Sequence, residues 1–332
     1  MEYDVYCSTG GGPWVNAGTD TWVNLWMELV APHLKVKPIL LLHRNKPKGH
    51  EDYQFPIEAH WHGDNIEKFD ELCKGARRIN ILHGHYTPMR CIVDNKDKIH
   101  SNVIHNSVNH IIMSQVATDA PRGWYPYLDS AWEKDINEWA KHSIWIGLFN
   151  IPYKNKNIRN FYEFEHNLPL SKSNKMGFAS RCEGRKNPHF LDKKDCFIFT
   201  NSREFKVIWK QGAGVECHNA RIYHYDSSFK DKFWNMDWGI SHSCFVAEPF
   251  GYGIFQAVDY GKLPIIHKFW CKDLDYPYRA QTKKEFDDIY NKLRETPYEE
   301  KNKWFLHLKQ YMIENFTNKD KWVEELLNIY NV

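Results

Sequence analysis

The chain has 332 residues, of which 42% are hydrophobic and 26% are charged. This composition is ordinary for globular proteins, and the length fits two domains of about 150 residues better than one core. The net charge of only +2 excludes binding of polyanions through bulk charge, although a local basic face remains compatible with it.

The eight cysteines are scattered without a C-x-x-C pair, and the sequence shows no signal peptide. This pattern favours reduced thiols in a reducing compartment over a disulfide framework. No apolar run reaches the roughly 18 residues that a membrane helix needs. We therefore expect a soluble cytoplasmic protein with no membrane partner.

The N-terminal half alternates strand and helix patterns. Strands are expected in "EYDVYCST" (2–9), "KPILLLH" (37–43) and "RRINILHGH" (77–85), with a helix in "NIEKFDELCKGA" (65–76). A long aromatic and polar stretch, 115–145, then leads to "IWIGLFNIPY" (144–153). Another helix follows the first strand, because apolar residues from Trp22 to Val30 recur at helical spacing, and Thr19 or Asp20 is a plausible cap for it.

The pattern restarts after "SKSNK" (171–175), which has the composition of a linker. Strands are expected in "MGFAS" (176–180), "DCFIFTN" (195–201), "FKVIWKQ" (205–211), "NARIYHYD" (219–226), "SHSCFVAE" (241–248) and "KLPIIHK" (262–268). Thr282 with Glu285, and Thr296 with Glu299, predict capping boxes for two helices. The last segment, "KDKWVEELLNIY" (319–330), is an amphipathic helix.

Two successive halves of this kind predict an α/β protein with two Rossmann-like, doubly wound domains facing across a cleft. We place an acceptor-binding domain at 1–170 and a donor-binding domain at 171–318. We expect the helix in 319–332 to pack back on the first domain. A single large α/β domain is the alternative.

Two segments have the composition of anion sites. Gly10, Gly11 and Gly12 follow the first strand, where backbone N–H groups and a helix N-terminus can approach a phosphate, although such turns also arise for steric reasons. They do not form the G-x-G-x-x-G fingerprint, which disfavours a nicotinamide enzyme. In "SRCEGRKNPHFLD" (180–192), Arg181, Arg185 and Lys186 would hold a diphosphate, or form an exposed basic turn.

A third segment, "AEPFGYGIFQAVDYGKLPII" (247–266), resembles the nucleotide-sugar motif of retaining GT-B glycosyltransferases, in which E-P-F-G precedes a helix and then G-x-P and a strand. The 180–192 segment resembles the Arg…Lys-Asn-Pro phosphate segment of the same family. The resemblance covers most of 175–270, and the first domain in outline.

The resemblance implies a role for each matching residue. Arg181 and Lys186 would clamp the donor diphosphate, Glu248 would face the donor-sugar hydroxyls, and the turn at Phe250 and Gly251 would bring N–H groups to sugar or phosphate. The family usually has a second Glu, for the ribose, where this chain has Gln256. The other expected donor-site residues are Gly11, Gly12, His83, His85, Arg185, Pro249 and Tyr252, and a structural or surface role is the alternative for His83 and His85.

The resemblance also implies a retaining, metal-independent reaction without a cofactor, in which a UDP-linked sugar is the expected donor. A metal site at His83 and His85 with His60 and His62 is an alternative, since H-x-H opens several hydrolase metal sites. The D-x-D at 273–275 is expected to be a chance match.

The acceptor is expected to be a hydroxyl group, with a 5-hydroxymethylated pyrimidine in double-stranded DNA as the first choice. "FQAVDYGKLPIIHKFW" (255–270) is similar to a segment of the DNA α-glucosyltransferases of T-even phages, which modify hydroxymethylcytosine; a phage-encoded protein would work in the host cytoplasm. Basic clusters around 35–48, at 77–78 and at 154–159 would contact phosphates if they share a face.

Four acceptor-side residues follow from this choice. Trp124, Tyr125 and Tyr127 would stack on a base, or pack between the domains, and Asp20 would be an acceptor-side base or a helix cap. A saccharide or glycan acceptor is an alternative. A non-catalytic protein that binds nucleotide sugars or nucleic acid is another, favoured by Gln256 and disfavoured by the joint presence of Arg181, Lys186 and Glu248.

Overall fold

The computed structural model describes the chain as two units. The described residues are 2–8, 18–42, 52–61, 65–83, 108–112, 143–147, 156–180, 186–192, 194–200, 221–224, 229–245, 250–268, 270–271 and 273–331. Unit 1 comprises Met1–Asn160 with Lys319–Val332, and unit 2 comprises Phe161–Asn318.

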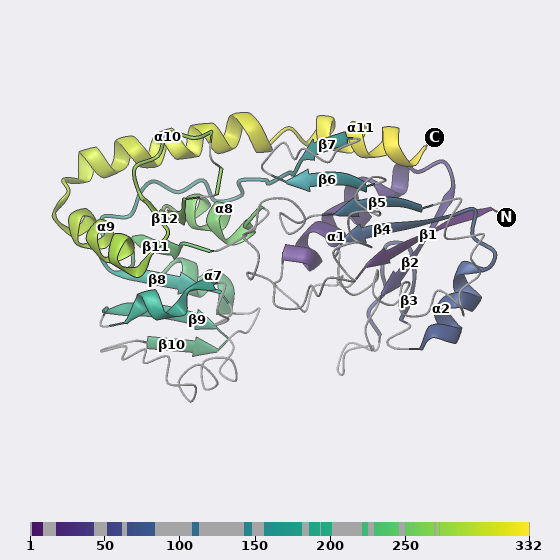
Figure 1. The fold of residues 1–332 in the computed structure, drawn as a ribbon, viewed down its shortest axis with the longest axis horizontal. Helices are drawn as coiled ribbons and strands as arrows, with labels where there is room; N and C mark the ends of the chain where they lie inside the picture. The colour runs from purple at the N-terminus through teal and green to yellow at the C-terminus, as the bar shows by residue number, and fades with distance from the viewer. Residues whose placement is uncertain are drawn as a thin grey trace. The chain divides into compact units, whose positions relative to one another are not determined.

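Unit 1 is built on a seven-stranded parallel sheet (Figure 1). Its strands are β1 (Tyr3–Ser8), β2 (Lys37–Leu42), β3 (Glu58–Trp61), β4 (Arg78–His83), β5 (Val108–Ile112), β6 (Ser143–Gly147) and β7 (Lys156–Arg159), in the order β3-β2-β1-β4-β5-β6-β7. Its described helices are α1 (Gly18–Leu29), the short 3-10 helix η1 (Ala31–His33), α2 (Ile66–Cys73) and α11 (Lys319–Tyr330). Residues 39–42 of β2 are all buried, as expected for a parallel strand covered on both faces.

The C-terminal helix α11 belongs to unit 1. Its Trp322 packs edge-to-face on Trp22 of α1, with ring centroids 6.1 Å apart, and Tyr330 packs in the same way on Tyr6 of β1 at 5.3 Å. The N–H of Lys35 donates to Oδ1 of Asn331 at 2.9 Å. Aromatic burial therefore joins the two ends of the described chain.

Unit 2 has a six-stranded parallel sheet. Its strands are β8 (Met176–Ala179), β9 (Cys196–Thr200), β10 (Arg221–His224), β11 (Ile240–Ser243), β12 (Leu263–His267) and β13 (Arg279–Ala280), in the order β10-β9-β8-β11-β12-β13. Its described helices are the 3-10 helix η3 (Pro188–Leu191), α7 (Lys230–Trp234), α8 (Tyr252–Asp259), α9 (Lys283–Glu295) and α10 (Tyr298–Phe316). Both sheets thus have the strand order of doubly wound folds, as the sequence predicts.

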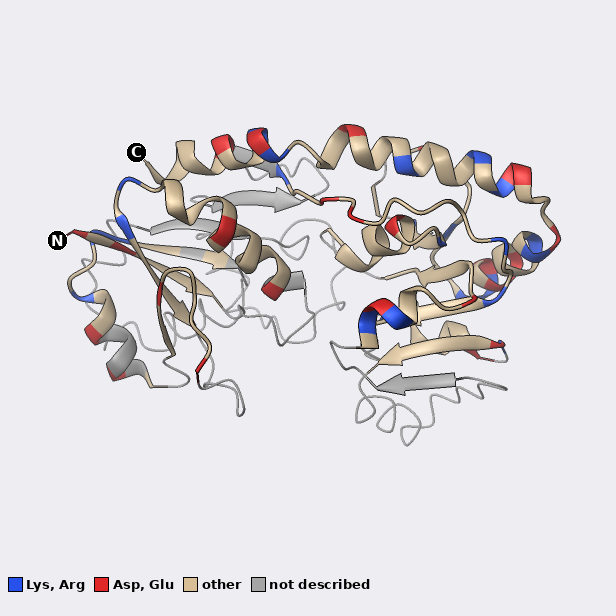
Figure 2. Ribbon diagram, turned by 180° about the vertical axis from the view of Figure 1, so that it is seen from behind, with Lys and Arg blue, Asp and Glu red and all other residues tan. Residues whose placement is uncertain are grey.

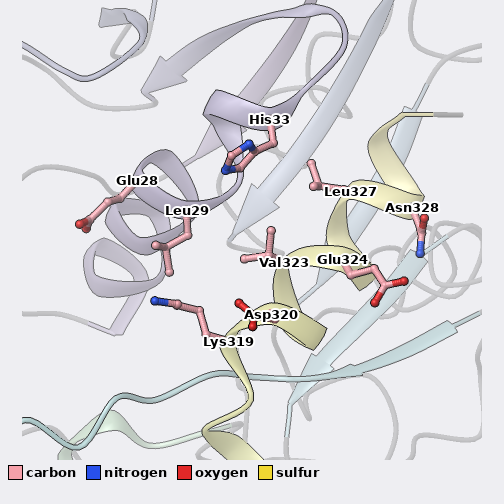
Figure 3. Close-up of a pocket in the computed structure, with 9 residues that line it drawn as sticks. All are labelled: Glu28, Leu29, His33, Lys319, Asp320, Val323, Glu324, Leu327 and Asn328. Carbon is pink, nitrogen blue, oxygen red and sulfur yellow. The ribbon is translucent and has the colours of Figure 1, made fainter.

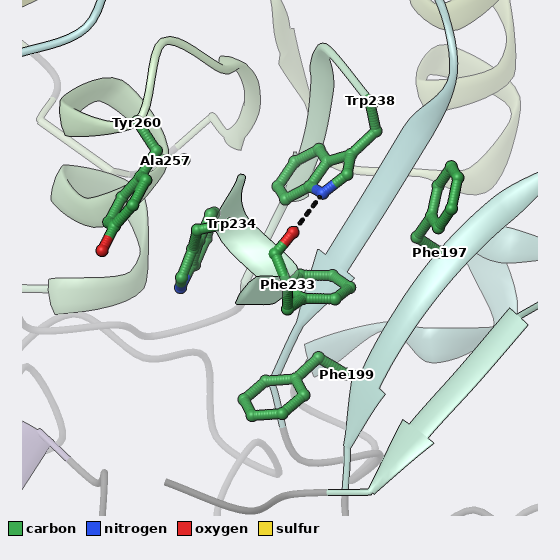
Figure 4. Close-up of a cluster of buried hydrophobic side chains, with 7 residues drawn as sticks. All are labelled: Phe197, Phe199, Phe233, Trp234, Trp238, Ala257 and Tyr260. Carbon is green, nitrogen blue, oxygen red and sulfur yellow. Dashed lines mark hydrogen bonds between the residues drawn. The ribbon is translucent and has the colours of Figure 1, made fainter. Parts of the chain in front are cut away.

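An aromatic cluster fills the core of unit 2 between β9, α7 and α8 (Figure 4). Its members are Phe197, Phe199, Phe233, Trp234, Trp238, Ala257 and Tyr260. The Trp238 ring covers Gly177 so closely that a Cβ there would lie 2.3 Å from it, and its Nε1–H donates to the carbonyl oxygen of Phe233 at 2.9 Å. The buried indole is therefore both packed and hydrogen-bonded.

The boundary between the units lies before residue 161 rather than after 170, because the segment from 161 onward is bonded to unit 2. The carboxylate of Asp259, at the end of α8, accepts the backbone N–H groups of residues 165–167 at 2.6–3.2 Å. Ser171 donates its N–H to the carbonyl of Gly261, so 171–175 is not a linker between the units. Gly261 has φ +68°, and a Cβ there would lie 1.9 Å from the carbonyl oxygen of Pro169.

The capping predictions had mixed outcomes. The capping box of Thr282 and Glu285 is confirmed at the start of α9. The box at Thr296 is wrong, because Thr296 ends α9 with its hydroxyl donating to the carbonyl of Lys292, and α10 begins after Pro297 without a side-chain cap. Helix α1 begins at Gly18, so Thr19 and Asp20 lie within its first turn instead of capping it.

The predicted strand at 205–211 lies outside the described residues. None of the described helices is long and apolar enough to cross a membrane.

Candidate functional site

The carboxyl ends of β8 and β11 form the topological switch point of the unit 2 sheet. The two strands are neighbours, and from them the chain continues to β9 on one side and to β12 on the other. Ligands of open α/β sheets bind outside the carboxyl ends of the strands at such a point. The segment 180–192 leaves β8 there, and the segment 244–251 leaves β11.

Hydrogen bonds join these two segments. The side-chain amide of Asn187 donates to the carbonyl oxygen of Cys244 at 2.8 Å, and Nε2 of His242 lies 3.0 Å from the carbonyl oxygen of Asn187. Asn187 has a left-handed backbone (φ 50°), which Asn tolerates better than most residues. The segment after β8 is therefore fixed to β11 by the Asn of the Lys-Asn-Pro match, for which the sequence predicts no role of its own.

His242, which links the two segments, is fully buried, and its imidazole is held in one protonation state. Its Nδ1 accepts the backbone N–H of Cys244 at 3.3 Å, which leaves the proton on Nε2 to be donated to Asn187. Burial, together with the nearby charges of His189 and Lys194, lowers the pKa of His242 to about 3. The neutral imidazole therefore persists at physiological pH.

Lys186 is the sequence-predicted cation that the structure describes. Its side chain is buried, with 8% exposed, and its Nζ lies 4.4 Å from the ring centroid of Phe245, just past β11. An ammonium group over an aromatic face gains a cation–π contact. Lys186 thus lies beside the chain leaving β11. Its sequence partners Arg181, Arg185, Glu248 and Pro249 lie outside the described residues.

The turn after β11 requires a glycine. Gly251 is the N-cap of α8 with φ 82°, a left-handed conformation that strains residues with a Cβ. Phe250 is 1% exposed and stacks on Phe255 with ring centroids 4.3 Å apart. Tyr252, also buried, is the first residue of α8, and Gln256 is half-buried one turn later. This arrangement presents the N-terminus of α8 at the switch point, where its dipole favours an anion.

The switch point of the unit 1 sheet lies between β1 and β4. Ser8 and His83, at their carboxyl ends, are register partners. Gly11 and Gly12, which follow Ser8 in the sequence, lie outside the described residues, as do His85 and the aromatic candidates Trp124, Tyr125 and Tyr127. Asp20 is buried in the first turn of α1, with 2% exposed.

The described basic residues of unit 1 are partly neutralised. Arg77 makes a bidentate ion pair with Asp4, and Nζ of Lys37 lies 2.5 Å from the carboxylate of Glu58. Acidic and basic residues are interspersed along α10 and α11 (Figure 2). Residues 43–48 of the first basic cluster lie outside the described residues, so the phosphate-contacting face stays a prediction.

A surface cavity of about 640 Å³ lies between α1, η1 and α11 (Figure 3). It is lined by Glu28, Leu29, His33, Lys319, Asp320, Val323, Glu324, Leu327 and Asn328. Glu28 is in the last turn of α1. None of the sequence-predicted site residues lines this cavity.

The described residues contain no group of three or more His, Cys, Asp or Glu side chains that could hold a metal ion. Asp273 and Asp275 are both exposed in the loop between β12 and β13. Nε2 of His60 lies 2.8 Å from a carboxylate oxygen of Glu58. His62 and His85 lie outside the described residues, so the H-x-H alternative stays a hypothesis.

Comparison with known proteins bears on the fold. No family model and no curated protein sequence matches the chain. One similar solved structure is WaaG, a glycosyltransferase involved in lipopolysaccharide biosynthesis, with a TM-score of 0.62 and 11% identity over 98% of this chain and 99% of that one. A second is an α-glucosyltransferase in complex with UDP and a 13-mer DNA containing an HMU base, with a TM-score of 0.58 and 10% identity over 100% of both chains. A third is the DNA-modifying enzyme β-glucosyltransferase, with a TM-score of 0.52 and 9% identity over 99% of this chain and 100% of that one. The chain has the GT-B fold. At these identities the likeness establishes the architecture, while activity and substrate have to be argued from the site.

Proposed function

We propose that this GT-B protein is a glycosyltransferase that moves a sugar from a nucleotide-diphosphate sugar to a hydroxyl acceptor. One observation carries the proposal: the two segments with donor-site residues leave adjacent strands at the switch point of the unit 2 sheet. There the buried Lys186 and the N-terminus of α8 both favour an anion. The left-handed Gly251 supports the same assignment, since the E-P-F-G turn needs a residue without a Cβ.

The chemistry follows from the charges that develop during transfer. Breaking the bond between sugar and phosphate builds negative charge on the diphosphate and positive character on the sugar. In the proposed mechanism Lys186 and Arg181 stabilise the leaving diphosphate, which makes a metal ion unnecessary, and Glu248 holds sugar hydroxyls. Removal of one such charge-stabilising group typically costs about 10²–10³ in rate.

We further propose that the anomeric configuration is retained and that the donor is UDP-linked. Retention is supported by the likeness of 247–266 to the motif of retaining enzymes. The names of the similar structures include both an α- and a β-glucosyltransferase, so this support comes from the motif and not from the fold. The stereochemistry of the product is the direct test.

For the acceptor, we propose a 5-hydroxymethylated pyrimidine in DNA. Two of the similar structures are named as acting on DNA or binding it, and one contains a DNA oligomer with an HMU base. The second candidate is a saccharide acceptor, favoured by the likeness to WaaG.

The test is a mass measurement on DNA. The protein is incubated with a duplex containing 5-hydroxymethylcytosine, with a matched unmodified duplex, and with a panel of nucleotide sugars. A gain of one sugar mass on the hydroxymethylated duplex alone supports the whole proposal. Release of nucleoside diphosphate without modification of DNA keeps the glycosyltransferase and moves the acceptor to saccharides. No turnover of any donor contradicts the proposal.

Variants test the diphosphate clamp. Lys186→Ala and Arg181→Ala are expected to abolish turnover while the protein stays folded. Lys262→Ala is the control, because Lys262 is also buried (4% exposed), but it precedes β12 at the opposite end of the sheet and donates to the carbonyls of Met236 and Trp238. Turnover at the wild-type rate in both clamp variants would overturn their assignment.

A further inference from the structure

Arg279, the first residue of β13, organises the loop that leaves the carboxyl end of β12. Its guanidinium donates four hydrogen bonds to backbone carbonyls of this loop: Nη1 to Lys268 (3.2 Å) and Trp270 (2.6 Å), and Nη2 to Cys271 (2.6 Å) and Leu274 (2.7 Å). The planar guanidinium suits such a fan of acceptors, whereas a lysine ammonium is a single point donor. One side chain thus fixes the path of the loop.

The loop adopts a conformation that needs support. Cys271 has a left-handed backbone (φ 51°), which is unfavourable for a residue with a Cβ. Its carbonyl is held by Arg279, and its Sγ lies 3.1 Å from the hydroxyl of Tyr311 on α10. Arg279 therefore sustains a turn that the loop would not favour by itself.

The loop held by Arg279 contacts the turn at Phe250 and Gly251 through the indole group of Trp270. Trp270 is buried, with 2% exposed, and its Nε1–H donates to the carbonyl oxygen of Phe250 at 2.8 Å. Its ring meets Phe255 edge-on, with centroids 6.1 Å apart, and Phe255 stacks on Phe250. Hydrogen bonds thus run from Arg279 through the loop and Trp270 to the residue before Gly251.

This contact determines where the next N–H points. The peptide bond between Phe250 and Gly251 is trans, so its C=O and N–H groups point in opposite directions. With the carbonyl bonded to Trp270 in the interior, the Gly251 N–H is directed away from that loop. The peptide group between Phe250 and Gly251 cannot flip without breaking the hydrogen bond from the Trp270 indole to the Phe250 carbonyl.

We propose that Trp270 and Arg279 are positioning residues, which orient the Gly251 N–H for the donor sugar-diphosphate. The inference rests on the proposed function, because it assigns the turn at 250–251 to donor binding. Neither residue need touch the donor, since Arg279 acts through the loop and Trp270 through the Phe250 carbonyl.

The test compares two matched tryptophan variants. Trp270→Phe removes the indole N–H and keeps an aromatic ring. Trp238→Phe removes an equivalent buried bond, from Nε1–H to the Phe233 carbonyl at 2.9 Å, at the amino end of β11 (Figure 4). Loss of one neutral hydrogen bond corresponds to a factor of about 5–10 in an equilibrium. We measure hydrogen exchange of the amides of residues 251–253, kcat and KM for UDP-glucose hydrolysis, and the melting temperature.

We expect similar losses of melting temperature in both variants. Exchange at residues 251–253 is expected to be about 5- to 10-fold faster, and kcat about tenfold lower, in Trp270→Phe only. Arg279→Lys should behave like Trp270→Phe. Unchanged exchange at 251–253 in Trp270→Phe, or an equal change in Trp238→Phe, overturns the inference. If the wild-type protein hydrolyses no nucleotide sugar, the proposed function fails, and the exchange comparison still decides whether these residues orient the turn.

Discussion

Acid should weaken unit 2 through His242, and the size of the effect follows from its burial. The pKa of His242 is about 3 in the folded protein, against 6.5 for an ordinary histidine. The unfolded chain therefore binds more protons than the folded one between these two values, so the stability is fully present above about pH 6.5 and is lost as the pH falls towards 3. Between about pH 7.5 and about pH 5, this linkage amounts to about 2 kcal/mol of unfolding free energy.

The perturbation is His242→Gln, which replaces the imidazole by a side chain that does not titrate but keeps a donor and an acceptor. Unfolding free energies are measured by urea titration at the two pH values. His267, whose pKa burial lowers to about 4, contributes to both proteins and cancels in the comparison. The wild-type protein should lose about 2 kcal/mol more than the variant on acidification. Equal losses in both proteins would refute the assignment of a buried neutral imidazole to this junction.

Three further predictions concern backbone positions and buried charge. Gly261→Ala should lower the unfolding free energy by about 2–4 kcal/mol, because of its left-handed φ and a Cβ clash with a carbonyl oxygen. Gly253→Ala, whose Cβ would meet its nearest atom at 3.8 Å, should change it by less than about 1 kcal/mol, and similar urea midpoints for the two would contradict the clash. Thr282→Ala should cost about 1 kcal/mol by removing the capping box of α9, again measured in urea. Asp259→Ala should cost about 3–5 kcal/mol and speed hydrogen exchange at residues 165–167, and unchanged exchange there would show that the carboxylate does not hold them.

The alternation of strands and helices, and the glycine at 251, could be predicted from the sequence because these features are local. Apolar runs determine strands, and a Gly before a helical pattern indicates a turn with positive φ. The box at Thr282 is local in the same sense. The similar pattern at Thr296 failed because α9 extends up to that residue, so its hydroxyl bonds the helix it ends.

The features that could not be predicted depend on contacts between residues far apart in the chain. "SKSNK" has a linker composition, yet its first residue is bonded to the turn at Gly261. His242 and Arg279 belong to no motif, and Asn187 belongs to the Lys-Asn-Pro match without an expected role. The roles of all three come from which carbonyls lie within reach in the folded protein. The available signal was a polar residue within a strand expected to be buried in a parallel sheet, as His242 is in β11.

Because α11 belongs to unit 1, the order in which the two units are synthesised on the ribosome differs from the order in which they can finish folding. Unit 2 is one continuous stretch, whereas unit 1 needs both Tyr6 and Tyr330, which pair across almost the whole chain. During synthesis the aromatic surface of β1 and α1 is made first, yet its covering helix emerges only after all of unit 2. Domains usually mature from the N-terminus onward. Here the first unit to be synthesised is the last to be completed, and its early portion is the one most in need of chaperone protection.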